Sequence, residues 1–176
     1  TILFNYNKLS EKINNNIGNL SDLISLHLST NMLTGSIPQS IGNLKKTISL
    51  LLGNNMLSGP IPISLGNMTS LINLDLINNK ISGEIPSSFG NLLNLKRIYL
   101  QNNMLEGCFP STMLKYCILS ESDNLSTVGY NFRQNKDLIF EGDFGRWCAG
   151  EGRAKAEIIP NAPLCEGSDL ILNGSG

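Results

Sequence analysis

The sequence has little charge and a single histidine. Charged residues make up 15% of the 176 residues, and 13 basic side chains against 14 acidic ones leave a formal net charge of −1. A protein that binds a nucleic acid backbone or an anionic lipid surface needs a basic patch, and the sequence contains no run of basic residues that could form one. Nucleic acid and membrane surfaces are therefore not expected partners.

Long apolar runs and closely paired cysteines are also missing. No stretch reaches the roughly 18 to 20 apolar residues of a membrane helix, so we expect no membrane insertion in this chain. The four cysteines, at 108, 117, 148 and 165, form no C-x-x-C pair, and the only histidine, His27, lies far from them. Because a structural zinc site is built from such pairs, the sequence indicates neither a metal nor a cofactor.

What the sequence does contain is a repeat. The row from Leu20 to Asn43 reads LSDLISLHLSTNMLTGSIPQSIGN, and the following rows restate it with the same spacing. Each row carries one asparagine at the same place, 24 residues after the last: Asn7, Asn31, Asn55, Asn79 and Asn103. Repeats of this length cannot bury their apolar residues alone, so neighbouring rows must stack.

Each row combines an alternating segment with a Gly-x-Ile-Pro or Gly-x-Phe-Pro segment. In Leu26-His27-Leu28 the leucines face one side and His27 the other, which is typical of a short strand. The glycine and the proline fix the returning half of the row. We expect the repeated asparagine inside the bend after the strand, where its amide pairs with backbone groups of adjoining rows and forms a structural ladder.

The rows match LxxLxxLxLxxNxLxGxIPxxIGN over residues 1–115, and the sequence therefore resembles the plant-type class of extracellular leucine-rich-repeat proteins. The resemblance implies an α/β solenoid, a right-handed superhelix of one partial and four full turns without an N-terminal cap. It also implies a concave parallel β-sheet, an irregular or 3-10 convex side, a disulfide-bearing C-terminal cap, and a secreted or cell-surface location.

The first row departs from the pattern. Glu11 stands at the glycine position and Asn14 at the proline position, so we expect a looser return segment there. Because no capping turn precedes this row, its apolar side chains should stay partly uncovered. These side chains are Ile2, Phe4, Leu9, Ile13 and Ile17. We interpret the chain as a fragment that aggregates or associates end to end when expressed alone.

After Lys115 the 24-residue spacing fails, and the cysteines begin near this point. Residues 116–150, with the segment GDFGRWC that ends at Cys148, resemble the cap that closes such repeats in secreted bacterial proteins. The disulfide candidates are Cys108, Cys117 and Cys148. Spacing alone leaves open the three pairings that four cysteines permit, and we favour Cys117 with Cys148.

The last part of the chain is predicted to leave the repeats. Residues 151–155 are interpreted as a linker. Residues 156–176 resemble the truncated start of an Ig-like module of secreted multidomain bacterial proteins, and the partner of Cys165 would lie in its missing part. Neighbouring domains of the same polypeptide are then expected partners.

A catalytic interpretation of the outward strand residues fails on spacing. His27 and Asp75 occupy equivalent positions two rows apart with Leu51 between them, hence about 9 to 10 Å apart at the usual interstrand distance. Neither Ser25 nor Ser49 sits on a strained turn with an oxyanion hole. We therefore predict no catalytic residue and no enzyme activity.

The outward strand positions remain as the candidate binding surface. They run from small hydroxyl side chains in the second row to arginine and tyrosine, which are favoured interface anchors, in the fifth. The predicted ligand-binding residues are His27, Leu51, Asp75, Ile77, Arg97 and Tyr99. The expected function is an extracellular recognition module whose concave face binds a protein or a polysaccharide.

Two other functions stay open at this stage. The solenoid could be a rigid spacer in a multidomain surface protein, or a plant-style receptor ectodomain or polygalacturonase-inhibitor-like protein. Ice binding, which needs a flat and regular threonine array, is not favoured because the outward positions vary from row to row.

Overall fold

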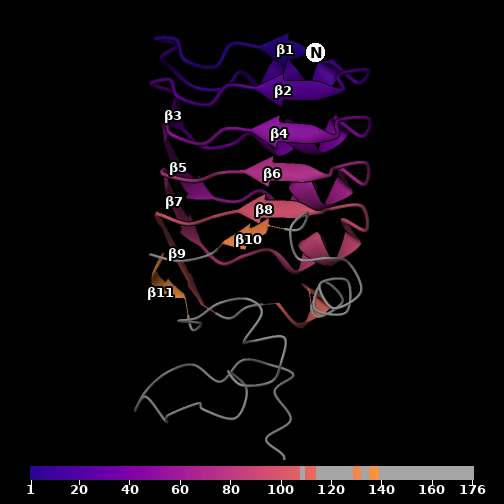
Figure 1. Cartoon of the computed structure of the whole chain (residues 1–176), viewed down its shortest axis with the longest axis vertical. Coiled ribbons are helices and arrows are strands. Elements are labelled where there is room, and N and C mark those ends of the chain that lie inside the picture. Colours follow the sequence, from indigo (N-terminus) through magenta and orange to yellow (C-terminus); the bar gives the residue numbers. More distant parts are fainter. Residues whose placement is uncertain (108–109, 114–128, 132–134, 139–176) are drawn as a thin grey trace, which may run out of the picture.

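The 24-residue rows fold into coils that stack along one axis, as Figure 1 shows. The computed structural model describes residues 1–107, 110–113, 129–131 and 135–138. Within these residues the coils supply strands to two parallel sheets, and a 3-10 turn closes each repeat. The predicted solenoid of parallel strands and 3-10 turns is confirmed.

The alternating leucine segments form one parallel sheet, which we call the concave sheet. Its strands follow one another along the solenoid in the order β1 (Ile2–Leu3), β2 (Ser25–His27), β4 (Ser49–Leu51), β6 (Asn73–Asp75), β8 (Arg97–Tyr99) and β10 (Gly129–Asn131). From β1 to β8 each residue lies opposite the one a full repeat later, as Leu26 lies opposite Leu50. Equivalent side chains therefore form lines that cross the strands.

A second parallel sheet follows the bends, and the sequence did not predict it. Its strands are β3 (Thr34–Gly35), β5 (Met56–Pro60), β7 (Lys80–Gly83), β9 (Asn103–Gly107) and β11 (Asn135–Leu138). These segments lack the alternating apolar pattern. The first four also contain glycine, and β5 contains proline, and both residues weaken a strand prediction. Glycine is favoured here because Gly59, for example, has a φ of 74°, in the left-handed region.

The convex side consists of 3-10 turns, as the resemblance implied. They are η1 (Asn15–Asn19), η2 (Gln39–Asn43), η3 (Ile63–Asn67), η4 (Ser87–Asn91) and η5 (Ser111–Met113). In η2 the N–H of Ile41 donates to the carbonyl of Pro38 at 3.0 Å, and that of Leu44 donates to Ile41 at 3.1 Å. Across the part of the chain that the structure describes, no helical segment has the length and apolar character of a membrane span.

Apolar side chains from both faces fill the space between the concave sheet and the convex turns. Leu26, Leu50, Leu74 and Ile98, at the centre of successive strands, are each 0% exposed. Phe89 of η4 is equally buried and belongs to the same cluster. The core is continuous because each coil covers the apolar face of the next.

The first row keeps two local features of the others, although its return segment forms only an isolated bridge, from Lys12 to Thr34, where later rows form strands. Glu11 adopts a φ of 74°, close to the 70° of Gly35. The side chain of Asn14 accepts a hydrogen bond from the N–H of Asn16 at 2.8 Å, and this cap starts η1 without a proline. A left-handed residue and an asparagine cap thus replace the glycine and the proline.

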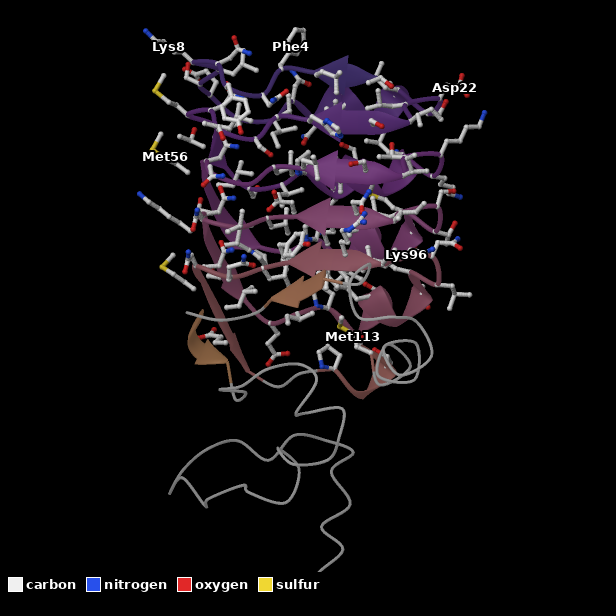
Figure 2. The ribbon with its side chains drawn as sticks, in the orientation of Figure 1. Phe4, Lys8, Asp22, Met56, Lys96 and Met113 are labelled. Carbon is white, nitrogen blue, oxygen red and sulfur yellow. The ribbon has the colours of Figure 1, made fainter. Side chains whose placement is uncertain are left out.

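Most of the apolar side chains that were predicted to be partly uncovered in the first row are exposed or half-buried. Phe4 is 56% exposed and protrudes at the indigo end of the solenoid in Figure 2, and Leu9 is 39% exposed. Ile2 and Ile17 are half-buried against the core. The expectation was wrong for Ile13, which is 8% exposed, because its side chain joins the core beside the second coil.

Strands continue beyond the last regular repeat. β10 lies beside β8 in the concave sheet, and β11 lies beside β9 in the second sheet. Both strands fall within the segment that the sequence assigned to the cap, where the leucine spacing gives no signal. The four cysteines, the predicted linker and the Ig-like segment lie outside the described residues.

Candidate ligand-binding site on the concave sheet

The parallel register brings four of the six predicted binding residues into one line across the concave sheet. Its members, in strand order, are His27, Leu51, Asp75 and Tyr99. All four are half-buried, and each lies on the strand next to its neighbour in the line, about 4.8 Å away by backbone spacing. We call this set the central line.

Arg97 lies beside the central line and not in it. It pairs in register with Asn73, and its Nη1 donates a hydrogen bond to Oδ1 of Asn73 at 2.9 Å. This contact holds the exposed guanidinium at the β6–β8 boundary. Within the described residues Arg97 forms no ion pair, so its charge stays available to a ligand.

Ile77 lies on the opposite side of the central line, two residues beyond Asp75, and its position depends on Gly53. A Cβ atom on Gly53 would meet Ile77 Cγ2 at 2.6 Å and Oδ1 of Asp75 at 2.7 Å. Because Gly53 has no side chain, the side chains of Ile77 and Asp75 can lie close above its backbone. The sequence does not single out Gly53, because only the structure gives these approaches.

Asp75 is the electrostatic centre of the site. Its carboxylate is half-buried and accepts one hydrogen bond, from the N–H of Ile77 to Oδ1 at 3.0 Å. Burial raises the pKa of Asp75, and the bond from Ile77 opposes this increase only in part. Among the described residues the one ion pair joins Lys46 and Asp22 on an exposed edge, so Asp75 has no cationic partner there.

His27 forms a local contact and no catalytic constellation. Its Nε2 lies 3.0 Å from Oγ of Ser49 on the adjacent strand, which fixes the ring over β4. The carboxylate that would orient the ring, Asp75, lies one strand further, with Leu51 in the line between them. Among the described residues around His27, the geometry supplies no base that is oriented by an acid, as nucleophilic catalysis requires.

A buried acceptor was missed by the sequence reasoning. Gln101 follows the central line two residues after Tyr99, and its Oε1 is buried without a hydrogen-bond partner. An unpaired buried carbonyl is costly, so Gln101 lowers the stability of this part of the coil. Nothing in the sequence distinguishes this glutamine from an exposed polar residue.

The repeated asparagines lie away from the concave surface and hold the coils together. The amide nitrogen of Asn55 donates to the carbonyls of Leu28 at 3.0 Å and Leu52 at 2.9 Å, and its Oδ1 accepts from the N–H of Leu33 at 3.0 Å. Asn31, Asn79 and Asn103 repeat these bonds one coil apart, whereas Asn7 donates only to Asn5. The amides thus satisfy backbone groups that no strand pairing reaches.

No group of three or more metal-ligating side chains comes together in the ranges that the structure describes. The concave sheet offers hydrogen-bond donors and acceptors, two charges of opposite sign and the apolar side chains of Leu51 and Ile77. These features fit the recognition of a flexible ligand by contacts spread over several strands.

Solved structures of plant proteins share this fold. The plant peptide hormone receptor RGFR1 in complex with RGF2 matches with 31% identity and a TM-score of 0.69, over 78% of this chain and 20% of the receptor chain. The ectodomain of the receptor kinase GASSHO1/SCHENGEN3 from Arabidopsis thaliana, in complex with CASPARIAN STRIP INTEGRITY FACTOR 2, matches with 39% identity and a TM-score of 0.68, over 77% and 15%. This chain thus spans a fifth or less of these receptor chains.

A plant ice-binding protein matches as well, with 38% identity and a TM-score of 0.62, over 65% of this chain and 37% of that one. No curated protein sequence matches the chain. A family model described as Leucine Rich Repeat matches residues 22–44, 46–68, 70–92 and 94–116, which together make up more than half of the sequence. The chain belongs to the leucine-rich-repeat proteins.

Proposed function

We propose that the concave sheet binds a peptide segment of a protein partner outside the cell or at its surface. The observation that carries this proposal is the central line, where four chemically different side chains stand at one equivalent position of an otherwise regular frame. Regular stacking does not require this variety, because the side chains that differ are outside the core. Variety at equivalent surface positions is what selective binding requires.

The comparisons support a peptide over a polysaccharide. One of the structurally similar proteins is a plant peptide hormone receptor in complex with RGF2, and another is a receptor-kinase ectodomain in complex with CASPARIAN STRIP INTEGRITY FACTOR 2. The apolar side chains of Leu51 and Ile77 among polar groups also suit a chain of mixed side chains, since interface cores combine apolar area with a few polar anchors. Polysaccharide binding remains the second candidate of the recognition class.

We do not propose ice binding for this chain, although a similar plant protein binds ice. The central line presents an imidazole, an isobutyl group, a carboxylate and a phenol, so no flat array of identical groups repeats along this face. Arg97 and Asp75 also place opposite charges on adjacent strands. A surface of this kind discriminates among ligands by charge and shape.

Selection of peptides from a displayed random library on the purified chain tests the proposal. We expect peptides that bind the parent chain and lose binding to Leu51→Arg, which places a long charged side chain in the middle of the central line. The matched control is Ile63→Arg on η3, because Ile63 is 71% exposed on the convex side. Peptides that tolerate Leu51→Arg and lose binding to Ile63→Arg would contradict the proposal.

A second readout uses the two anchors at the fifth coil. The double variant Arg97→Ala with Tyr99→Ala should weaken the selected peptides while leaving the thermal midpoint almost unchanged, since Arg97 is exposed and Tyr99 is half-buried. A glycan array probed with the same variants separates the polysaccharide candidate. If neither peptides nor glycans bind through this face, the spacer function is favoured instead.

A further inference from the structure

We propose that Asp75 and Tyr99 form a subsite for a cationic side chain, a lysine or an arginine, of the bound peptide. This inference rests on the proposed function and names one chemical feature of the ligand. Asp75 and Tyr99 are register partners on β6 and β8, so a carboxylate and a phenol ring lie side by side on the concave sheet.

The carboxylate of Asp75 lacks a counter-charge. Its one hydrogen bond comes from the backbone N–H of Ile77, and its partial burial penalises the charged form. Arg97, on the adjacent strand, donates instead to Asn73, which is uncharged. A cation from a ligand would supply the missing partner, and charge-assisted hydrogen bonds are the stronger ones.

The surroundings favour a long basic side chain over a small free cation. Leu51 lies beside Asp75 in the central line and Ile77 leans over Gly53, so apolar atoms flank the carboxylate on two sides. Lysine and arginine bury aliphatic stems along such surfaces and keep only the charged end polar. The ring of Tyr99 adds an attraction for a cation that approaches its face.

The direction of approach follows from the fixed charge of Arg97. Arg97 precedes Tyr99 by two residues and would repel a cation that enters from its side. Ile77 and Gly53 lie on the other side of Asp75 and carry no charge. The cationic group therefore enters from the side of Ile77 and Gly53, away from Arg97.

The experiment compares peptides selected on the parent chain with those selected on Asp75→Asn. We expect lysine or arginine to be enriched at one peptide position on the parent chain, and this enrichment to disappear on Asp75→Asn. For a selected peptide, either Asp75→Asn or replacement of its cation by leucine should weaken binding about 10- to 100-fold, and the two changes together should cost little more than one. Tyr99→Phe should retain the preference and Tyr99→Ala should reduce it.

The controls separate this inference from the proposed function. Asp22→Asn removes an exposed carboxylate that pairs with Lys46 at the edge opposite Met56 in Figure 2, and it should leave peptide binding unchanged. Peptides that lose binding to Leu51→Arg but neither prefer a cation nor respond to Asp75→Asn would overturn the subsite alone. Peptides that do not respond to Leu51→Arg would overturn the proposed function and the subsite together. Asn at position 75 can still accept the bond from Ile77, so the variant is expected to fold.

Discussion

The inward and outward side chains of the concave strands obey different constraints. Leu50 and Leu51 are adjacent residues of the same type on β4, yet Leu50 is 0% exposed and Leu51 is half-buried on the surface. Along the solenoid the inward position holds Leu26, Leu74 and Ile98, all of similar size. The outward position changes chemistry at every coil. The frame therefore restricts one face and leaves the other free for recognition.

The same contrast explains why a half-buried carboxylate is placed at Asp75. No cationic partner among the described residues offsets its desolvation, so it does not stabilise the coil in which it lies. Groups held at a cost to stability are typical of binding surfaces, which give up stability for function. Thr47, which is also buried, differs because its hydroxyl donates to the carbonyl of Leu23 at 2.6 Å.

The largest expected loss of stability comes from truncating a buried side chain on the inward face of the concave sheet. Leu50→Ala removes a fully buried side chain and leaves a cavity between three coils, which should lower the free energy of unfolding by about 4 kcal/mol. Leu51→Ala is the matched control and should cost below about 1 kcal/mol, because the side chain is partly in water already. Urea denaturation measures both. Equal losses for the two leucines would remove the distinction between the faces.

A slightly smaller effect is expected from the asparagine ladder. Asn55→Ala leaves the carbonyls of Leu28 and Leu52 and the N–H of Leu33 without this partner, which should cost about 3 kcal/mol. Asn7→Ala serves as the control, since Asn7 is exposed and makes a single bond at 2.9 Å to a carbonyl two residues away. Thermal unfolding compares the two variants. A loss for Asn7→Ala that matches Asn55→Ala would contradict the bridging role.

Thr47 is a buried polar residue in a core that is otherwise mainly apolar, and its substitution tests the contribution of its hydrogen bond. Thr47→Val keeps the shape but removes the hydroxyl that donates to Leu23, and the free energy of unfolding should fall by about 1 kcal/mol. Thr47→Ser retains the donor and loses a methyl group. An increase in stability with valine would mean that the hydrogen bond contributes nothing to the frame.

The smallest expected change in the free energy of unfolding concerns Asp75. Unlike the substitutions above, its replacement should increase stability. Burial raises the pKa of Asp75 in the folded chain above its ordinary value of 3.8, so the folded state holds its proton to higher pH than the unfolded state does. This contribution to stability is complete below pH 3.8 and is lost as the pH rises through the folded pKa. The asparagine of Asp75→Asn does not ionise, so the stability of this variant does not depend on pH through position 75.

We therefore expect Asp75→Asn to be slightly more stable than the parent chain at neutral pH, with the difference shrinking toward pH 3.8. Thermal midpoints measured across this range test the expectation. A variant that is destabilised at neutral pH and not in acid would show that the carboxylate has a stabilising partner in the folded chain.

Much of the frame could be predicted from the sequence because it depends on residue spacing. The interval between equivalent asparagines set the register that places Asp75 opposite Tyr99, and the alternation of leucines identified the inward side chains. The second sheet could not be predicted, because segments such as Met56–Pro60 pair through their backbone without an apolar alternation. The lean of Asp75 over Gly53 depends on side-chain packing that spacing does not encode.

Other details required the fold as well. The sequence aligned Glu11 with the repeated glycines but did not reveal that it adopts their left-handed conformation. β10 and β11 extend both sheets although the leucine spacing has ended. Strand register places His27 near Ser49. Their hydrogen bond depends in addition on the orientation of the imidazole ring, which the sequence does not give.

The most direct test of the recognition surface is the change in methyl chemical shifts when a selected peptide is added. We expect the signals of Leu51 and Ile77 to shift. Those of Ile63 on the convex turn η3 and Met56 at the start of β5, which are 71% and 41% exposed, should stay in place. Shifts confined to Ile63 and Met56, with Leu51 and Ile77 unchanged, would contradict binding on the concave sheet.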